Sequence, residues 1–129
     1  MRYIDSSHWL PPVFHGATLR GTAFMQVHEL NEVTVITVLN EECGTLLKTV
    51  DPMIEKGRLR YVFDMSQATF LNSVNIATII ATRNRIVAAG GKVAVSNLAD
   101  NIRDVFRILR LERLFDLTLD LERAVVQVR

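Results

Sequence analysis

The hydrophobic pattern of this chain alternates between two periods. Short apolar runs rich in β-branched residues predict strands, whereas apolar residues that recur every three or four positions predict helices. The predicted order is β-β-α-β-α-β-α-(β)-α, which favours one α/β domain with a mixed, mostly parallel sheet. The predicted strands cover 25–30, 33–39, 58–64 and 92–96, and the predicted helices cover 46–56, 73–89, 98–110 and 120–126.

Several local signals add detail to this pattern. Residues 31–32 predict a tight turn between the first two strands, and Asn97 with Asp100 resembles a capping pair for the third helix. Pro52 lies inside the first helical stripe and would kink that helix or begin a second segment. Residues 114–117 are expected to form a short edge strand.

The stretch from 61 to 91 joins a strand to a long helix. The strand ends at Asp64, a loop covers 65–71, and the helix begins at Asn72 and Ser73. Ligands and partners tend to bind at the carboxyl edge of strands in such sheets. In the simplest interpretation Asn72 or Ser73 caps the helix. Alternatively, Ser73 accepts a phosphate, which a helix N-terminus tolerates but a docked neutral or acidic surface would not.

Residues 1–22 carry no regular period and are predicted to be an extension, with the domain covering 23–129. The Pro11-Pro12 pair excludes a helix there. This segment either lies along the domain surface, held by Trp9 and Phe14, or binds a partner as an arm.

Composition narrows the class of protein. The 129 residues are 49% hydrophobic and 22% charged, which is typical of one globular domain. The net charge of +1 argues against direct nucleic-acid binding. The apolar runs are too short for membrane insertion, and no signal peptide is recognisable. The single cysteine, Cys43, fits a reducing compartment, so we expect a cytoplasmic protein.

Signatures of catalysis are missing from the sequence. His8, His15 and His28 do not form a helical metal pair, so no metal site is expected. No phosphate-binding glycine loop follows a strand, no GxSxG surrounds a serine, and no histidine follows Ser73. The carboxylates before Cys43 would raise the pKa of its thiol. We therefore expect neither an enzyme nor a cofactor.

The segment FDMSQATFLNSVNIATIIATRNRIVAAGGKVAVSNL resembles a STAS domain of the anti-sigma-factor antagonist type. Asp64-Met65-Ser66 matches the family's turn, Phe70-Leu71 its apolar pair, and Gly90-Gly91 its helix end. Ser73 falls on the serine that is phosphorylated in the family. The resemblance spans about 23–129 and implies a single-domain fold with helices packed mainly on one face of the sheet.

Three positions depart from the family pattern. Asn72 stands where the family usually has Asp, Val74 where it has Ser or Thr, and Asn75 where it has Gly. Asn72 can still cap a helix. The carboxylate that is lost with Asn72 would alter recognition by a kinase. Asn75 adds a side chain where the family keeps the backbone close to the partner. The altered motif would also suit a family member that is never phosphorylated.

The resemblance implies a bacterial regulatory module that binds an anti-sigma factor with serine/threonine kinase activity. Ser73 would be its phosphoacceptor. An alternative is an adaptor STAS domain, in a stress-signalling scaffold or a lipid-transport complex, that has no phosphorylation switch. A homodimer is a further alternative for this protein. The residues expected to contact the partner are Asp64, Ser66, Asn72, Val74, Asn75 and Ile76.

Overall fold

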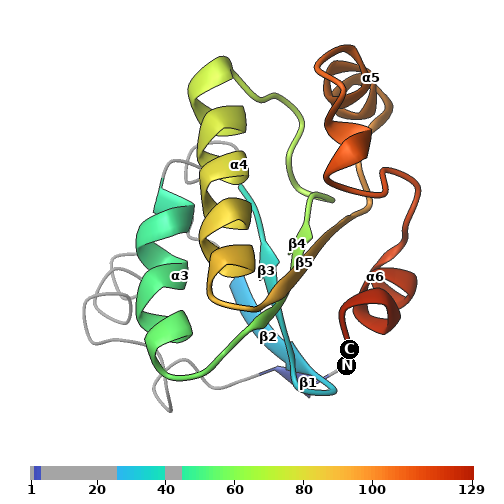
Figure 1. Cartoon of the computed structure of the whole chain (residues 1–129). Coiled ribbons are helices and arrows are strands. Elements are labelled where there is room, and N and C mark those ends of the chain that lie inside the picture. Colours follow the sequence, from blue (N-terminus) through green and yellow to red (C-terminus); the bar gives the residue numbers. More distant parts are fainter. Residues whose placement is uncertain (1, 4–25, 40–44) are drawn as a thin grey trace, which may run out of the picture.

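The protein forms one mixed sheet with helices on both sides (Figure 1). The computed structural model describes residues 2–3, 26–39 and 45–129. The strands lie in the order β1-β2-β3-β4-β5; β1 and β3 pair antiparallel with β2, whereas β3, β4 and β5 run parallel. The strands are β1 (Arg2–Tyr3), β2 (Gln26–Leu30), β3 (Val33–Thr37), β4 (Arg60–Asp64) and β5 (Lys92–Ser96).

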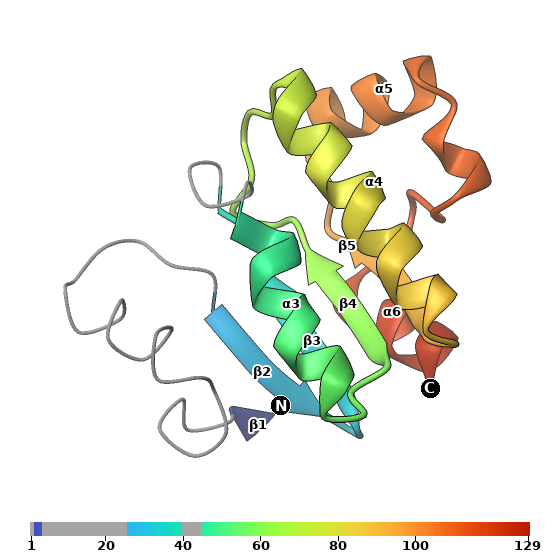
Figure 2. The ribbon, with the colours of Figure 1, turned by 60° about the vertical axis from the view of Figure 1, so that its left-hand side comes forward.

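Two long helices cover one face of the sheet, and the C-terminal helix covers the other (Figures 1 and 2). Helices α3 and α4 lie side by side, and α5 lies beyond the carboxyl end of β5. The predicted α/β class with a mixed sheet is confirmed. The helices are α3 (Leu46–Glu55), α4 (Ser73–Ala88), α5 (Asp100–Ile108), the 3₁₀ turn η2 (Leu111–Arg113) and α6 (Leu121–Val128).

The hairpin between β2 and β3 follows from its two turn residues. Asn31 and Glu32 have φ angles of 53° and 69°, the left-handed conformation that a type I′ turn requires at both central positions. This turn sets the register that pairs Leu30 with Val33. The predicted tight turn is confirmed.

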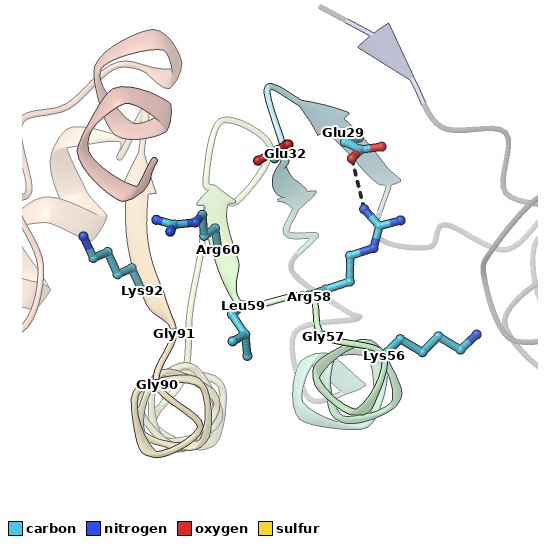
Figure 3. Close-up of a pocket in the computed structure, with 10 residues that line it drawn as sticks. All are labelled: Glu29, Glu32, Lys56, Gly57, Arg58, Leu59, Arg60, Gly90, Gly91 and Lys92. Carbon is cyan, nitrogen blue, oxygen red and sulfur yellow. Dashed lines mark hydrogen bonds and ion pairs between the residues drawn. The ribbon is translucent and has the colours of Figure 1, made fainter.

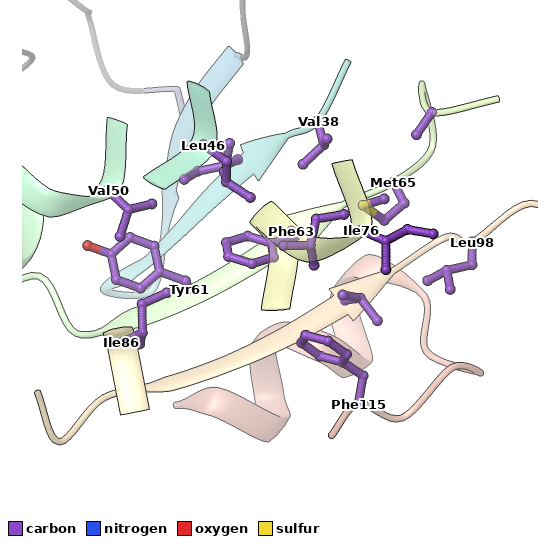
Figure 4. Close-up of a cluster of buried hydrophobic side chains, with 14 of the residues drawn as sticks. Val38, Leu46, Val50, Tyr61, Phe63, Met65, Ile76, Ile86, Leu98 and Phe115 are labelled. Atoms are coloured by element: carbon purple, nitrogen blue, oxygen red, sulfur yellow. The ribbon is translucent and has the colours of Figure 1, made fainter. Parts of the chain in front are cut away.

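Strand β4 is buried on both faces, which explains its continuous apolar run. Tyr61 and Phe63 point into the core beneath α3 and α4 (Figure 4). Val62 packs in a second core beneath α6. Alternate side chains of a strand point to opposite faces, so one strand contributes to both layers. Burial raises the pKa of the Tyr61 hydroxyl, which donates a hydrogen bond to the carbonyl oxygen of Arg58 at 2.7 Å.

Pro52 does not divide α3, because the helix runs through it from Leu46 to Glu55. Proline removes one backbone donor and usually destabilises a helix interior by about 3 kcal/mol. Here the buried face of the helix, which includes Val50 and Met53, offsets that cost. Gly57, with φ of 85°, follows the last turn as expected of a helix-ending residue.

The predicted capping pair before α5 was wrong. Ala99 occupies the N-cap and makes no side-chain cap bond, and Asp100 is already in the helix, where it pairs with Arg103 at 2.9 Å. Asn97 instead has φ of 56°, and its amide nitrogen donates to the Asp64 carboxylate. The Asn97 side chain, which the local pattern assigned to a helix cap, therefore links the end of β5 to the end of β4.

The predicted end of α5 and the strand after it were also wrong. The helix ends at Ile108, and Arg110 reverses the chain with φ of 60° before η2 begins. Residues 114–117 form no strand; Phe115 and Leu117 are buried in the main core instead. Their apolar character therefore comes from core packing and not from strand pairing.

Some predictions fall on residues that the structure does not describe. These are the bulk of the 1–22 extension, including Trp9 and Phe14, and the segment 40–44, which includes Cys43. Arg2 and Tyr3, within the predicted extension, pair with Glu29 and His28 as β1. None of the helices in the described ranges is long and apolar enough to cross a membrane. Within the same ranges, no three acidic, histidine or cysteine side chains gather as a metal site.

Candidate functional site

The start of α4 is fixed by Asn72. Its backbone is extended, and its side-chain oxygen accepts a hydrogen bond from the Asn75 N–H at 2.8 Å. Its carbonyl oxygen accepts from the Ile76 N–H at 3.1 Å. Asn72 is therefore the N-cap, and Ser73 is the first residue of the helix with a hydroxyl that capping does not require.

The position of Ser73 suits an added negative charge. The residue is exposed, and the first turn of α4 holds no acidic side chain. The capping bonds use the N–H groups of Asn75 and Ile76, and within the described ranges those of Ser73 and Val74 remain as the unpaired donors of the helix start. Together with the helix dipole they favour an anion at this point.

The turn after β4 is organised by the Asp64 carboxylate. It accepts hydrogen bonds from the Ser66 backbone N–H and hydroxyl at 3.2 and 3.1 Å. It also accepts from the Ser96 hydroxyl at 3.4 Å and from the Asn97 amide at 3.1 Å. Asp64 thus ties the carboxyl ends of β4 and β5 to the turn, and its role is to shape the loop before α4. Ser66 remains exposed beside it.

The predicted contact residues on the first turn of α4 differ in exposure. The side chain of Val74 is 66% exposed and Asn75 is half-buried, so both can present atoms to a partner. Ile76 is only 7% exposed and packs in the main core. Ile76 reaches the surface only where it lines the small hollow described below, and its contact with a partner stays a prediction.

A small apolar hollow, which sequence reasoning missed, adjoins the start of α4. Its volume is about 130 Å³. The amide nitrogen of Asn101 on α5 donates to the Thr69 carbonyl oxygen at 2.9 Å, which holds the loop before α4 against α5. The apolar pair Phe70-Leu71 was the sequence signal for one wall of this hollow. The wall that α5 forms depends on how α5 packs against the loop, which the sequence does not show. The lining residues are Phe70, Leu71, Ile76, Asn101, Ile102, Val105 and Phe106.

A second hollow of about 410 Å³ lies near the carboxyl end of β4. His28 is one of the residues that line it. Burial disfavours the charged imidazole and lowers the pKa of His28, and the negative charge of Asp64 opposes this shift. The polar groups around it are those of Gln26, Thr37, Asp64, Ser66 and Gln67.

A third hollow, of about 580 Å³, lies at the amino edge of the sheet, where the parallel strands β4 and β5 begin (Figure 3). It lies between Gly57 and Gly90, which follow the C-terminal ends of α3 and α4. Arg58 forms an ion pair with Glu29 at 3.0 Å, and Arg60 donates to the Val128 carbonyl oxygen at 2.8 Å. These cations lie where helix dipoles are negative, so a structural role accounts for them.

Comparisons with known structures agree with this architecture. A proposed anti-sigma factor antagonist from Thermotoga maritima superimposes with a TM-score of 0.71 at 19% identity, covering 81% of this chain and 94% of its own. The Bacillus cell fate determinant SpoIIAA in its phosphorylated form gives a TM-score of 0.64 at 17% identity, covering 81% and 99%. An anti-sigma-factor antagonist (STAS) domain protein from Planctomyces limnophilus gives 0.68 at 16% identity, covering 82% and 98%.

Comparisons of sequence place the chain in a family. No curated protein matches it. The model of the STAS domain family matches residues 33–124, which run from the start of β3 into α6 and include the whole junction between β4 and α4. The chain therefore belongs to the STAS domain family.

Proposed function

We propose that this protein is an anti-sigma-factor antagonist that binds an anti-sigma factor with serine-kinase activity and is switched by phosphorylation of Ser73. The observation that carries the proposal is an exposed serine at the first position of α4, with a separate residue as the cap. Its place in a STAS domain, and the fold shared with an antagonist whose structure was determined in phosphorylated form, support this assignment.

The switch follows from the different demands of folding and docking. A phosphate on Ser73 adds about −1.5 to −2 charges at neutral pH. The unpaired N–H groups of Ser73 and Val74 and the helix dipole accept that charge, so the fold persists. A partner docked over Val74 would have to bury the same charge without a counter-ion, which is costly. Binding is therefore lost while the structure is kept.

The test is phosphorylation of the purified chain by a serine-kinase anti-sigma factor from the same genome, with ATP and intact-mass readout. We expect the wild type to gain one phosphate and Ser73→Ala to gain none. Thr118→Ala serves as the control and should be labelled like the wild type, because Thr118 is an exposed hydroxyl residue outside the expected contact residues. Equal labelling of wild type and Ser73→Ala would contradict the proposal.

Binding separates the switch from a scaffold role. The unphosphorylated protein should retain the anti-sigma factor in a pull-down, and Ser73→Asp should lose it because the carboxylate places a negative charge at the same point. Binding that Ser73→Asp leaves intact would favour an adaptor STAS domain without a phosphorylation switch.

A further inference from the structure

Polar side chains form a row across three strands at the carboxyl edge of the sheet. Gln26 pairs with Thr37 in the register of β2 and β3, and Thr37 pairs with Asp64 in the register of β3 and β4. Paired residues of adjacent strands project from the same face of a sheet. Val35 and Val62, which lie two positions before Thr37 and Asp64, belong to the core beneath α6, so the row is on that face. All three side chains of the row line the hollow of about 410 Å³.

The hydroxyl of Thr37 is the group in this row that points to a ligand. Thr37 is only 6% exposed, and it is one of the residues that line the hollow. Within the part of the chain that the structure describes, its side chain has no hydrogen-bond partner. Buried polar groups are nearly always hydrogen-bonded, so a buried hydroxyl that faces a hollow without a partner is suited to bind a ligand.

Two glutamine amides add further hydrogen-bonding groups to the hollow. Gln26 and Gln67 are exposed, and both line it. Among the described residues, neither amide is engaged by another side chain or by the backbone. Each amide carries two N–H donors and one carbonyl acceptor in a plane. Such a group forms paired hydrogen bonds with an edge that also holds a donor beside an acceptor, as glutamine does with adenine.

The charges around the hollow disfavour an ion. Asp64 is the one carboxylate among the described residues that line it, and its oxygens already accept hydrogen bonds from the turn after β4 and from β5. No lysine or arginine belongs to these described lining residues. Burial lowers the pKa of His28, so its imidazole is uncharged at neutral pH. An anion would therefore lose its hydration without a counter-ion, and a cation would find only a carboxylate that is already engaged.

The size of the hollow and its apolar wall limit the ligand further. Val35, Leu39 and Leu121 form the aliphatic part of the lining. Binding sites for small molecules usually measure about 300–1,000 Å³, and roughly 150 Å³ holds a benzene ring. A hollow of about 410 Å³ therefore has room for one ring with a polar substituent.

We propose that this hollow binds a small uncharged molecule that carries a carboxamide or lactam group on a ring. The Thr37 hydroxyl and the amides of Gln26 and Gln67 hydrogen-bond the amide group of the ligand, and the aliphatic side chains contact its ring. The inference goes beyond the proposed function and does not depend on phosphorylation of Ser73. Asp64 lines the hollow and also holds the turn before α4, so an occupant would lie next to the loop that leads to Ser73.

The first test is an NMR titration of the isotope-labelled full chain with a matched series of compounds. Nicotinamide carries the uncharged amide, methyl pyridyl ketone lacks its N–H donors, nicotinate is an anion, and picolylamine is a cation at neutral pH. Nicotinamide should shift the backbone amides of Thr37, Gln67 and Leu121 saturably, with a Kd of about 1 mM or lower. The ketone should bind at least about fivefold more weakly, and the two ions should not saturate in the same range.

Two threonine variants on β3 locate the site. Thr37→Val removes the hydroxyl at nearly constant volume and should weaken nicotinamide binding by about fivefold or more. Thr34→Val is the matched control, because Thr34 is 1% exposed and its hydroxyl is likewise without a partner among the described residues. Thr34 alternates with Val35 along β3 and so faces the opposite side of the sheet, where Ile36 packs in the main core. Its variant should change binding by less than about twofold.

Gln26→Leu keeps the inference testable if Thr37→Val does not fold, as judged by circular dichroism. Gln26 is exposed, so this variant should fold, and it should weaken nicotinamide binding by at least about threefold.

Three outcomes would overturn the inference. One is the absence of saturable nicotinamide binding, and another is binding of nicotinate or picolylamine as tight as that of nicotinamide. The third is an equal loss of binding in Thr34→Val and in the variants that line the hollow. Failure of the proposed function would look different: nicotinamide would bind, while Ser73 would gain no phosphate.

Discussion

The two edges of the parallel strands have opposite electrostatic character. At the carboxyl edge, α4 begins with the neutral residues Asn72 and Ser73 and unpaired N–H groups. At the amino edge, α3 and α4 end at glycines beside lysine and arginine side chains. Of the hollows described at these two edges, the one at the amino edge is the larger, and there Arg58 is engaged by Glu29 and Arg60 by a backbone carbonyl.

This difference is the reason why the proposed site follows the sign of the helix dipole and not the size of a hollow. Cations at the amino edge compensate the negative ends of two helices, so they already have a structural role. An anion at the carboxyl edge would meet donors without partners, so that edge can respond to a new charge. The proposed regulation therefore belongs to the start of α4, and a structural role belongs to its end.

The largest effect is expected at the amino edge, from Gly91→Ala. A Cβ at Gly91 would collide with the carbonyl oxygen of Leu59 and with the side chain of Ile86. We expect a loss of about 3 kcal/mol in the free energy of unfolding, measured by urea denaturation. Gly90→Ala is the control: its Cβ meets nothing within 4 Å, and the strain of φ at 87° costs roughly 1–2 kcal/mol. A larger loss in Gly90→Ala would contradict this account.

A smaller effect is expected from Asn72→Ala at the carboxyl edge. Removing the side chain that accepts the Asn75 N–H should destabilise the protein by about 1 kcal/mol, measured by the same unfolding assay. Asp120→Ala is the matched cap deletion on α6, where Asp120 accepts the Arg123 N–H at 2.9 Å. If Asn72→Ala left stability unchanged, Ser73 would have to cap α4 instead, and its hydroxyl would not be available for phosphorylation.

The smallest effect is a pH dependence that belongs to the carboxyl edge. Burial lowers the pKa of His28 below its ordinary value of 6.5, so the unfolded chain binds more protons than the folded chain just below that value. The contribution of neutral His28 to the free energy of unfolding is therefore complete above pH 6.5. It declines as the pH falls toward the pKa of His28 in the folded state. Unfolding midpoints at pH 5 and 7.5 should therefore differ more in wild type than in His28→Gln.

The control for this pH dependence is Arg58→Ala at the amino edge. Its ion pair with Glu29 is partly exposed and borders the hollow at the amino edge, not the one that His28 lines, so the variant should keep the wild-type slope. An equal slope in wild type and His28→Gln would show that the hollow next to Asp64 does not carry the effect.

Local sequence signals predicted the elements well where a single periodicity operates. The β2–β3 turn, the strands β4 and β5 and the long helix α4 all follow from residues close in sequence. The signals were misleading between α5 and α6. There, Phe115 and Leu117 resemble a strand because they are apolar, yet they fill the core beside Phe106. An apolar run alone does not say whether its partner is a strand or a packed helix.

The sequence by itself determined the order of elements from β2 to α5, the STAS resemblance and the serine at a helix start, because periodicity, turn residues and capping residues act over a few positions. Only the tertiary structure decided how that junction is built. It assigned the cap to Asn72, turned Asp64 inward to Ser96 and Asn97, and placed Ile76 in the core. It also left the apolar side chains of Ile108 and Leu109 exposed at the end of α5. These features depend on contacts between segments far apart in the chain, which no local pattern records.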